Sequence, residues 1–105
     1  MYEVKISPLA AEDLVEIKNY IEEELQNPIA ARNTVSKIVE TYEGLADCPE
    51  AGIPVSRYVS FPTDYRFVLA NNYSIFYRTE GEIVRIIRIL YSCRDFVRIL
   101  FGKSK

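Results

Sequence analysis

Runs of apolar residues in the last third of the chain predict a three-stranded β-meander. The runs are rich in Ile, Val, Phe and Tyr and contain no proline, and they cover residues 65–70, 73–79 and 82–91. Asn71-Asn72 separates the first two runs and Glu80-Gly81 the second two, and both pairs suit the positive φ of tight hairpin turns. The third run is apolar at both parities except at Arg85 and Arg88, which indicates a central strand.

Two-residue turns would fix the register of this meander and the face on which each side chain lies. They place Arg66 opposite Tyr77, Tyr77 opposite Val84, and Tyr73 opposite Arg88. One face then collects Arg66, Val68, Tyr73, Ile75, Tyr77, Val84, Ile86, Arg88 and Leu90. The other collects Phe67, Leu69, Phe76, Ile83, Ile87 and Ile89. The second face is the more apolar, so we expect it to carry the helices. Arg66 and Arg88 should then project from the opposite face, toward solvent or a partner. A one-residue bulge would exchange part of this assignment.

Earlier in the chain, alternation and helical spacing predict one strand and two helices. Residues 2–6 alternate apolar and charged side chains, as in a half-buried strand. Ser7-Pro8 and Asn27-Pro28 each place a capping residue before a proline at the first helical position. The apolar positions that follow recur at helical spacing, and they are Ala10, Leu14, Ile17, Ile21 and Leu25 in the first helix and Ala31, Val35, Ile38, Tyr42 and Leu45 in the second.

The remaining segments are a crossover and a tail. Residues 48–63 contain three prolines and are interpreted as the connection from the helices to the sheet, but long loops in compact domains also carry function. Residues 97–101 have helical spacing, and residues 102–105 should fray.

Together these elements predict a single α+β domain over residues 1–105, in the order β-α-α-β-β-β. A helix hairpin packs on one face of a mainly antiparallel four-stranded sheet, and a short C-terminal helix follows. A chain of 105 residues can bury a core without metals or disulfides. Without a third layer, the second face of the sheet stays open.

Composition argues against several classes of protein. No apolar run approaches the roughly 20 residues of a membrane span, and the first residues lack a signal-peptide core, so we expect a cytosolic protein without a membrane partner. Cys48 and Cys93 lack metal-ligand spacing, so two reduced thiols are expected. The chain has no histidine, which removes the commonest general base and transition-metal ligand. We therefore expect neither a metal nor a cofactor.

Charge divides the chain into an acidic and a basic half. Residues 1–56 carry four Lys or Arg against eleven Asp or Glu (−7), and residues 57–105 carry nine against four (+5), which sum to the net charge of −2. Two interpretations are open. One is a solvated acidic helix face beside a basic sheet, and the other is a sheet end that meets phosphate, nucleic acid or an acidic peptide.

Six side chains in and just after the meander form a candidate site, and they are Arg66, Tyr73, Tyr77, Arg88, Tyr91 and Arg94. Guanidinium groups bind phosphate through paired hydrogen bonds, and tyrosines stack on bases or donate a hydroxyl. Ordinary cross-strand packing of arginine against tyrosine explains the same residues equally well. The sequence contains no phosphate-cradling glycine loop, zinc-protease motif or nucleophile elbow.

Three stretches, in order along the chain, carry a resemblance to a known family. They are SPLAAEDLVEIKNYIEEELQNPIAA in the helix hairpin, GLADCPEAGIP in the crossover, and YRFVLANNYSIFYRTEGEIVRIIRILYSCRDF in the meander. With the β-α-α-β-β-β order, they resemble the RelE/ParE toxins of bacterial type II toxin–antitoxin (plasmid stabilisation) systems. The resemblance implies a growth-inhibiting toxin.

This family has two kinds of target. RelE-like members cleave mRNA at the ribosome without a metal, whereas ParE-like members inhibit DNA gyrase without that nuclease chemistry. Arg66 and Arg94 match family arginines, and Tyr91 falls where many members have histidine, so these three would be the catalytic residues of a nuclease. The NP-x-AA helix start and the L…P…G crossover look more like the ParE branch. Sparse lysines and an acidic net charge weaken the nuclease interpretation. Gyrase inhibition is the favoured hypothesis, with a nuclease and a non-toxic interaction module as alternatives.

The resemblance also implies a protein partner. Antitoxins of this family commonly wrap their toxin with an extended, foldable segment. We therefore expect an acidic, amphipathic segment of a cognate antitoxin to cover part of the sheet or the helix hairpin. The residues expected to bind partner or target are Arg66, Tyr73, Tyr77, Arg88 and Arg94. Whether the chain also self-associates is left open.

Overall fold

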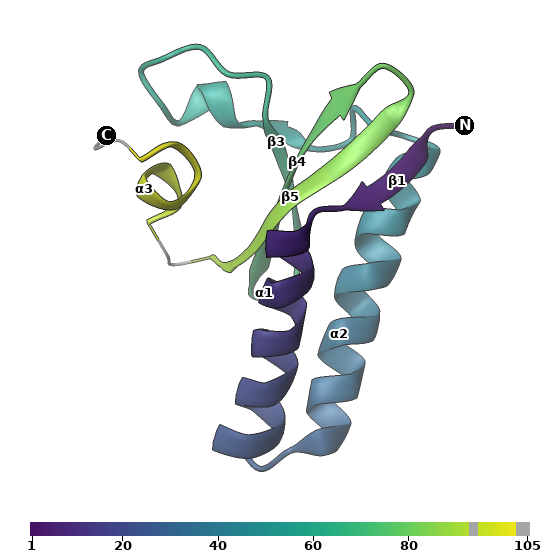
Figure 1. The fold of residues 1–105 in the computed structure, drawn as a ribbon, viewed down its shortest axis with the longest axis vertical. Coiled ribbons are helices and arrows are strands. Elements are labelled where there is room, and N and C mark those ends of the chain that lie inside the picture. The colour runs from purple at the N-terminus through teal and green to yellow at the C-terminus, as the bar shows by residue number, and fades with distance from the viewer. Residues whose placement is uncertain (93–94, 103–105) are drawn as a thin grey trace.

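The computed structural model describes residues 1–92 and 95–102, which fold as helices against a five-stranded sheet (Figure 1). The strands are β1 (Glu3–Ile6), β2 (Ile53–Pro54), β3 (Arg66–Ala70), β4 (Tyr73–Glu80) and β5 (Ile83–Tyr91). The helices are α1 (Pro8–Asn19), which continues as a π-helical turn (Tyr20–Glu24), α2 (Pro28–Glu43) and α3 (Phe96–Phe101). The predicted α+β class and element order are confirmed, and the crossover adds the short strand β2 to the four expected.

Both helices of the hairpin begin as their sequences predict. The Ser7 hydroxyl accepts a hydrogen bond from the Ala10 backbone N–H at 3.0 Å, and the Asn27 side chain accepts one from Ala30 at 3.0 Å. A proline follows each cap, where its missing N–H costs no helical hydrogen bond. The Ser7 hydroxyl also donates to the Ile87 carbonyl at 2.8 Å, which fixes the start of α1 to β5.

The sheet has the strand order β1-β5-β4-β3-β2. β1 runs parallel to β5, and the other neighbouring pairs are antiparallel. β5 therefore lies between two strands, which explains why its sequence is apolar at both parities.

The predicted register is right for β3 and β4 but wrong for β4 and β5. Arg66 lies opposite Tyr77 as predicted, whereas Tyr77 lies opposite Ile86 and Tyr73 opposite Tyr91. The second turn begins one residue later than expected, because Glu80 pairs with Ile83 and Gly81 takes the positive φ of 61°. A bulge between Phe76 and Tyr77 then gives β5 one extra residue.

The assignment of the two faces is also wrong. The helices cover the face that was expected to be open, since the core beneath them contains Ile75, Tyr77, Val84 and Ile86, all fully buried. Leu69, expected under the helices, is 58% exposed. Counting apolar residues misled here, because a tyrosine packs as well as an aliphatic residue when its hydroxyl finds a partner. Beyond the bulge the parity changes, so Ile89 joins the helix face and Leu90 leaves it.

The second face of the sheet is covered as well, so the expectation of an open face is wrong. α3 and the crossover pack there around a second core of Val55, Phe76 and Leu90. The Phe76 ring stacks on Phe96 of α3 with their centroids 5.3 Å apart. α3 and the crossover together therefore supply a partial third layer, which the sequence pattern did not predict.

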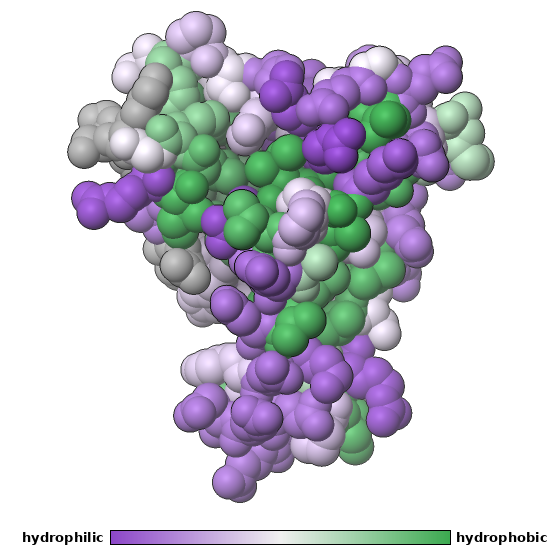
Figure 2. Space-filling view, viewed as in Figure 1, coloured by the Kyte–Doolittle hydropathy of each residue, from purple (hydrophilic) through white to green (hydrophobic). Residues whose placement is uncertain are grey.

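The helix hairpin extends beyond the sheet, so its far end lacks a covering layer (Figure 1). Leu25 and Ile29 at that end are mostly exposed, although Leu25 continues the apolar stripe of the first helix. The tip is otherwise largely hydrophilic, and apolar surface gathers across the middle of the molecule (Figure 2). Within residues 1–92 and 95–102, no helix has the length and apolar character that a membrane crossing requires.

Candidate functional site

A buried ion pair joins α1 to β5. Arg88 donates from Nε and Nη2 to the two carboxylate oxygens of Asp13 at 2.8 and 2.9 Å, and the Ile89 backbone N–H donates to the same carboxylate at 2.9 Å. These bonds raise the pKa of the Arg88 guanidinium above its ordinary value, and burial opposes that shift. The prediction that Arg88 projects from the face opposite the helices is wrong.

Asp13 was missed by sequence reasoning, although its position carried a signal. It lies three residues after Ala10 and four before Ile17, on the apolar stripe of the first helix. A carboxylate inside such a stripe needs a buried cation or several donors. Arg88, one of two charges in the otherwise apolar run of β5, was the natural partner.

Tyr77 is fully buried and fastens the crossover to the sheet. Its hydroxyl donates to the Pro49 carbonyl at 2.7 Å and accepts from the Gly52 backbone N–H at 2.9 Å. The prediction that Tyr77 contacts a partner is contradicted, because its ring and its hydroxyl are both engaged inside the fold. Arg66 holds the same loop, since its Nη1 donates to the carbonyls of Gly52 at 2.8 Å and Glu50 at 3.5 Å.

The buried Tyr77 hydroxyl makes the folding stability depend on pH in the alkaline range. Burial raises its pKa above the usual value of about 10, although the hydrogen bond from Gly52 acts in the opposite direction. The unfolded chain then releases this proton at a lower pH than the folded chain. The stabilisation is complete below pH ~10 and falls as the pH rises through the folded pKa.

We expect Tyr77→Phe to flatten this dependence. Urea unfolding between pH 8 and 11.5 should show a smaller loss of stability for Tyr77→Phe above pH ~10 than for the wild type. At pH 8 the variant should be about 1–3 kcal/mol less stable, because Gly52 and Pro49 lose their partner. Tyr58→Phe changes an exposed tyrosine and is the control. Equal slopes for Tyr77→Phe and the control would contradict this role.

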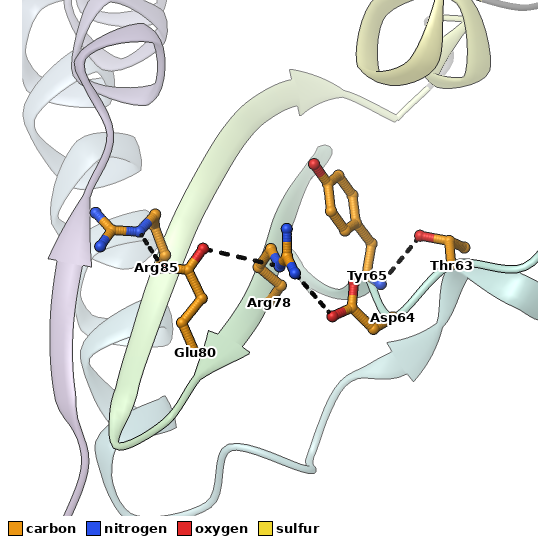
Figure 3. A network of polar contacts seen from close by, with 6 residues as sticks. All are labelled: Thr63, Asp64, Tyr65, Arg78, Glu80 and Arg85. Carbon is orange, nitrogen blue, oxygen red and sulfur yellow. Dashed lines mark hydrogen bonds and ion pairs between the residues drawn. The ribbon is translucent and has the colours of Figure 1, made fainter.

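Two further arginines of the basic half are neutralised within the sheet (Figure 3). Arg78 and Arg85 are cross-strand partners, a pairing that like charges disfavour. Glu80 lies between them, 3.0 Å from Arg85 Nε and 3.9 Å from Arg78 Nε, and Asp64 accepts from Arg78 at 3.1 Å. Arg78 also lies over the Tyr65 ring, 5.8 Å from its centroid. Two carboxylates therefore offset the two cations.

A cleft of about 1080 Å³ opens between the helix hairpin and the end of the sheet. Its walls come from α1, the π-helical turn, the start of α2, the β3–β4 turn and the end of β5. The lining residues are Asp13, Glu16, Ile17, Tyr20, Ile21, Leu25, Ala30, Thr34, Asn71, Asn72, Tyr73, Ile89, Leu90 and Tyr91. Tyr73 and Tyr91, both candidate site residues, meet here edge to face with ring centroids 5.8 Å apart.

The structure separates the residues that were predicted to act together. Arg66 on β3 lies opposite Tyr77 of β4. Tyr91 on β5 lies opposite Tyr73, four residues away along β4. The two positions are therefore roughly 13 Å apart along the strands and about 10 Å apart across them. Arg94, the third predicted catalytic residue, lies outside the described residues, as does Cys93, whereas Cys48 is an exposed free thiol.

Comparison with known proteins identifies the family. The sequence profile described as "ParE toxin of type II toxin-antitoxin system, parDE" matches residues 4–96. The chain belongs to this family. The matched residues run from β1 to the start of α3, and they include every residue that lines the cleft.

Solved structures agree with the assignment to the ParE toxin family. The structure described as "Chromosomal ParDE TA system from P. aeruginosa" superposes with a TM-score of 0.73 at 26% identity, covering 87% of this chain and 96% of that chain. The toxin–antitoxin complex RelBE2 from Mycobacterium tuberculosis superposes with a TM-score of 0.61 at 19% identity, covering 86% and 96%, and shows the fold alone. A search of curated protein sequences found no match.

Proposed function

We propose that this ParE-family toxin inhibits growth in the cytoplasm by acting on DNA gyrase, and that a cognate antitoxin neutralises it. The toxin class follows from the family. The choice of target rests on one observation, the separation of Arg66 from Tyr91 in the sheet.

A ribonuclease of the alternative, RelE-like kind needs its proton-transferring group and its phosphate-binding cation at one scissile bond. A general base must lie within hydrogen-bonding distance, about 2.6–3.2 Å, of the proton that it removes. Arg66 on β3 and Tyr91 on β5 are instead held on opposite sides of β4, opposite residues four positions apart, and both strands that carry them are fixed by the sheet. To reach a single phosphate, both side chains would have to extend toward each other across β4, which the Arg66 guanidinium does not do.

Arg66 is also engaged elsewhere. Its guanidinium donates to two carbonyls of the crossover, so binding a phosphate would compete with bonds that hold this loop. Recruitment to the ribosome gains from phosphate neutralisation. Three of the arginines of the basic half are already matched by carboxylates, namely Arg78, Arg85 and Arg88. These observations favour a target recognised by protein–protein contact, as in gyrase inhibition.

The deciding experiment adds the purified chain to two assays run in parallel. In a gyrase supercoiling assay we expect inhibition that rises with toxin concentration, and in a programmed-ribosome assay we expect no mRNA cleavage. Arg66→Ala, which loosens the crossover, should reduce gyrase inhibition only as far as it lowers stability. Ribosome-dependent cleavage that Arg66→Ala abolishes, with gyrase unaffected, would establish the RelE-like alternative.

Expression in bacteria supplies the control for toxicity itself. Inducing the chain alone should stop growth, and inducing it with its neighbouring antitoxin gene should restore growth. A complex that elutes as one species at micromolar concentration would support the antitoxin partner. Normal growth in both cases would leave the third alternative, an interaction module without toxicity.

A further inference from the structure

The cleft between the helix hairpin and the sheet has an unusual lining. Among its described lining residues are two carboxylates, Asp13 and Glu16, and no Lys or Arg. The Asp13 carboxylate is neutralised by Arg88. Glu16 is exposed, and within residues 1–92 and 95–102 no cation lies within 4 Å of its carboxylate. Arg88 is still near enough for Glu16 to raise the pKa of its guanidinium, but among the described residues Glu16 has no ion pair of its own.

Three tyrosines from separate elements meet at the same cleft. Tyr20 lies in the π-helical turn and is 54% exposed, and Tyr91 at the end of β5 is 47% exposed. Tyr73 contacts Tyr91 edge to face. All three tyrosines line the cleft, where burial raises the pKa of the Tyr73 hydroxyl and the neighbouring Tyr91 and Tyr20 raise it further.

The chemistry of these side chains selects a cation. The faces of aromatic rings attract ammonium and guanidinium groups, and a nearby carboxylate strengthens that attraction. An anionic segment would meet the carboxylate of Glu16 here. The acidic antitoxin segment expected from sequence was to cover part of the sheet or the helix hairpin, and the sheet face expected to be open is covered by the hairpin itself.

The apolar part of the cleft gives the occupant its other property. Ile17, Ile21, Leu25 and Ile89 line the walls around the tyrosines. Leu25 is exposed because the hairpin extends beyond the sheet (Figure 1). Ile17, Ile21 and Ile89 are nearly buried, so the apolar surface open to a partner centres on Leu25, and an exposed apolar side chain beside polar residues is typical of a protein interaction site.

We propose that the cleft binds a segment of the cognate antitoxin which inserts one arginine or lysine between Tyr20, Tyr73 and Tyr91, with Glu16 as its counter-ion. The apolar side chains of the same segment lie on the isoleucine walls. This inference rests on the proposed function, since it names the part of the toxin that its antitoxin covers. It assigns to the antitoxin a cationic anchor within an apolar segment.

The test uses two peptides that differ only in charge. The probe is acetyl-Leu-Ala-Arg-Ala-Leu-amide, and its control carries citrulline, the neutral isostere of arginine. Each is titrated into the full chain while the tyrosine ring signals are followed by NMR. The arginine peptide should shift the ring signals of Tyr20, Tyr73 and Tyr91 in a saturable manner, with roughly tenfold tighter binding than the citrulline peptide.

Variants of the toxin distinguish the contribution of the Glu16 charge to peptide binding from that of the Tyr20 ring and from a general effect on folding. Glu16→Gln should remove most of the preference for arginine, whereas Glu40→Gln, the same change at an exposed position of α2 outside the cleft, should keep it. Tyr20→Leu should weaken binding of the arginine peptide but not of the citrulline peptide. Tyr20→Phe should retain binding of the arginine peptide because the aromatic ring remains. Equal binding of the two peptides, or no saturable shift with either, would overturn the proposal.

The antitoxin itself provides the second readout, and the outcomes can be told apart. Replacing its anchor arginine or lysine by methionine should weaken the complex about tenfold, to the same extent as Glu16→Gln in the toxin. A chain that prefers the arginine peptide but leaves gyrase active would contradict the proposed function alone. A gyrase inhibitor whose antitoxin affinity is unchanged by Glu16→Gln would contradict the cleft proposal alone.

Discussion

Replacing Asp13 by alanine should lower the free energy of unfolding by about 3 kcal/mol, because it removes one member of a buried ion pair. The Asp13 and Arg88 side chains are only 8% and 20% exposed. Without the carboxylate, the Arg88 guanidinium loses both of its hydrogen bonds and the Ile89 N–H loses its acceptor. Urea unfolding at neutral pH measures the effect.

Two further variants identify the cause. Glu12→Ala removes a neighbouring carboxylate that is exposed on α1, and it should change stability by no more than about 0.5 kcal/mol. The double replacement Asp13→Asn with Arg88→Met removes both charges, nearly keeps the side-chain volumes and leaves an amide oxygen to accept from the Ile89 N–H, so it should recover most of the loss. A loss below about 1 kcal/mol for Asp13→Ala would show that the pair is not needed to hold α1 on β5.

Gly52→Ala should destabilise the chain by about 2–3 kcal/mol, since a Cβ at this position has no room. It would lie 2.7 Å from Tyr77 Cε1, 2.9 Å from the Phe67 carbonyl, and closer still to the Tyr77 hydroxyl. Tyr77 is fully buried and cannot move aside without breaking its bonds to Pro49 and Gly52. The glycine is required here for close approach.

Gly44→Ala is the matched control. Gly44 has helical φ and ψ of −62° and −18°, and a Cβ there meets nothing within 4 Å. The replacement should be neutral or stabilise by up to about 1 kcal/mol through the unfolded state. If both alanine variants behave alike, the contact between Gly52 and Tyr77 does not constrain the crossover as described.

The basic half of the sequence is used mainly to build the fold. Arg88 pairs with Asp13, Arg78 with Asp64, and Arg85 with Glu80. Arg66 donates to carbonyls of the crossover. A local excess of arginine in sequence is therefore largely paired within the fold, and the cleft that we propose as the partner surface has no Lys or Arg among its described lining residues.

Local sequence patterns predicted the elements, their order and the family. Caps such as Ser7 and Asn27, prolines at the first helical position, and β-rich runs around tight turns act over a few residues, so they can be read locally. The apolar composition of β5 also predicted its central place in the sheet correctly.

The faces of the sheet and the residues of the site depend on contacts between distant parts of the chain. One bulge in β5 and a turn displaced by one residue changed the register, and side-chain orientation depends on register at every position. The burial of Tyr77 depended on acceptors and donors 25 to 28 residues away, in a loop without regular pattern. The cleft brings together Glu16, Tyr20, Tyr73 and Tyr91, which are up to 75 residues apart in sequence. Local sequence patterns cannot predict such a cleft, because it forms only when the helix hairpin packs on the sheet.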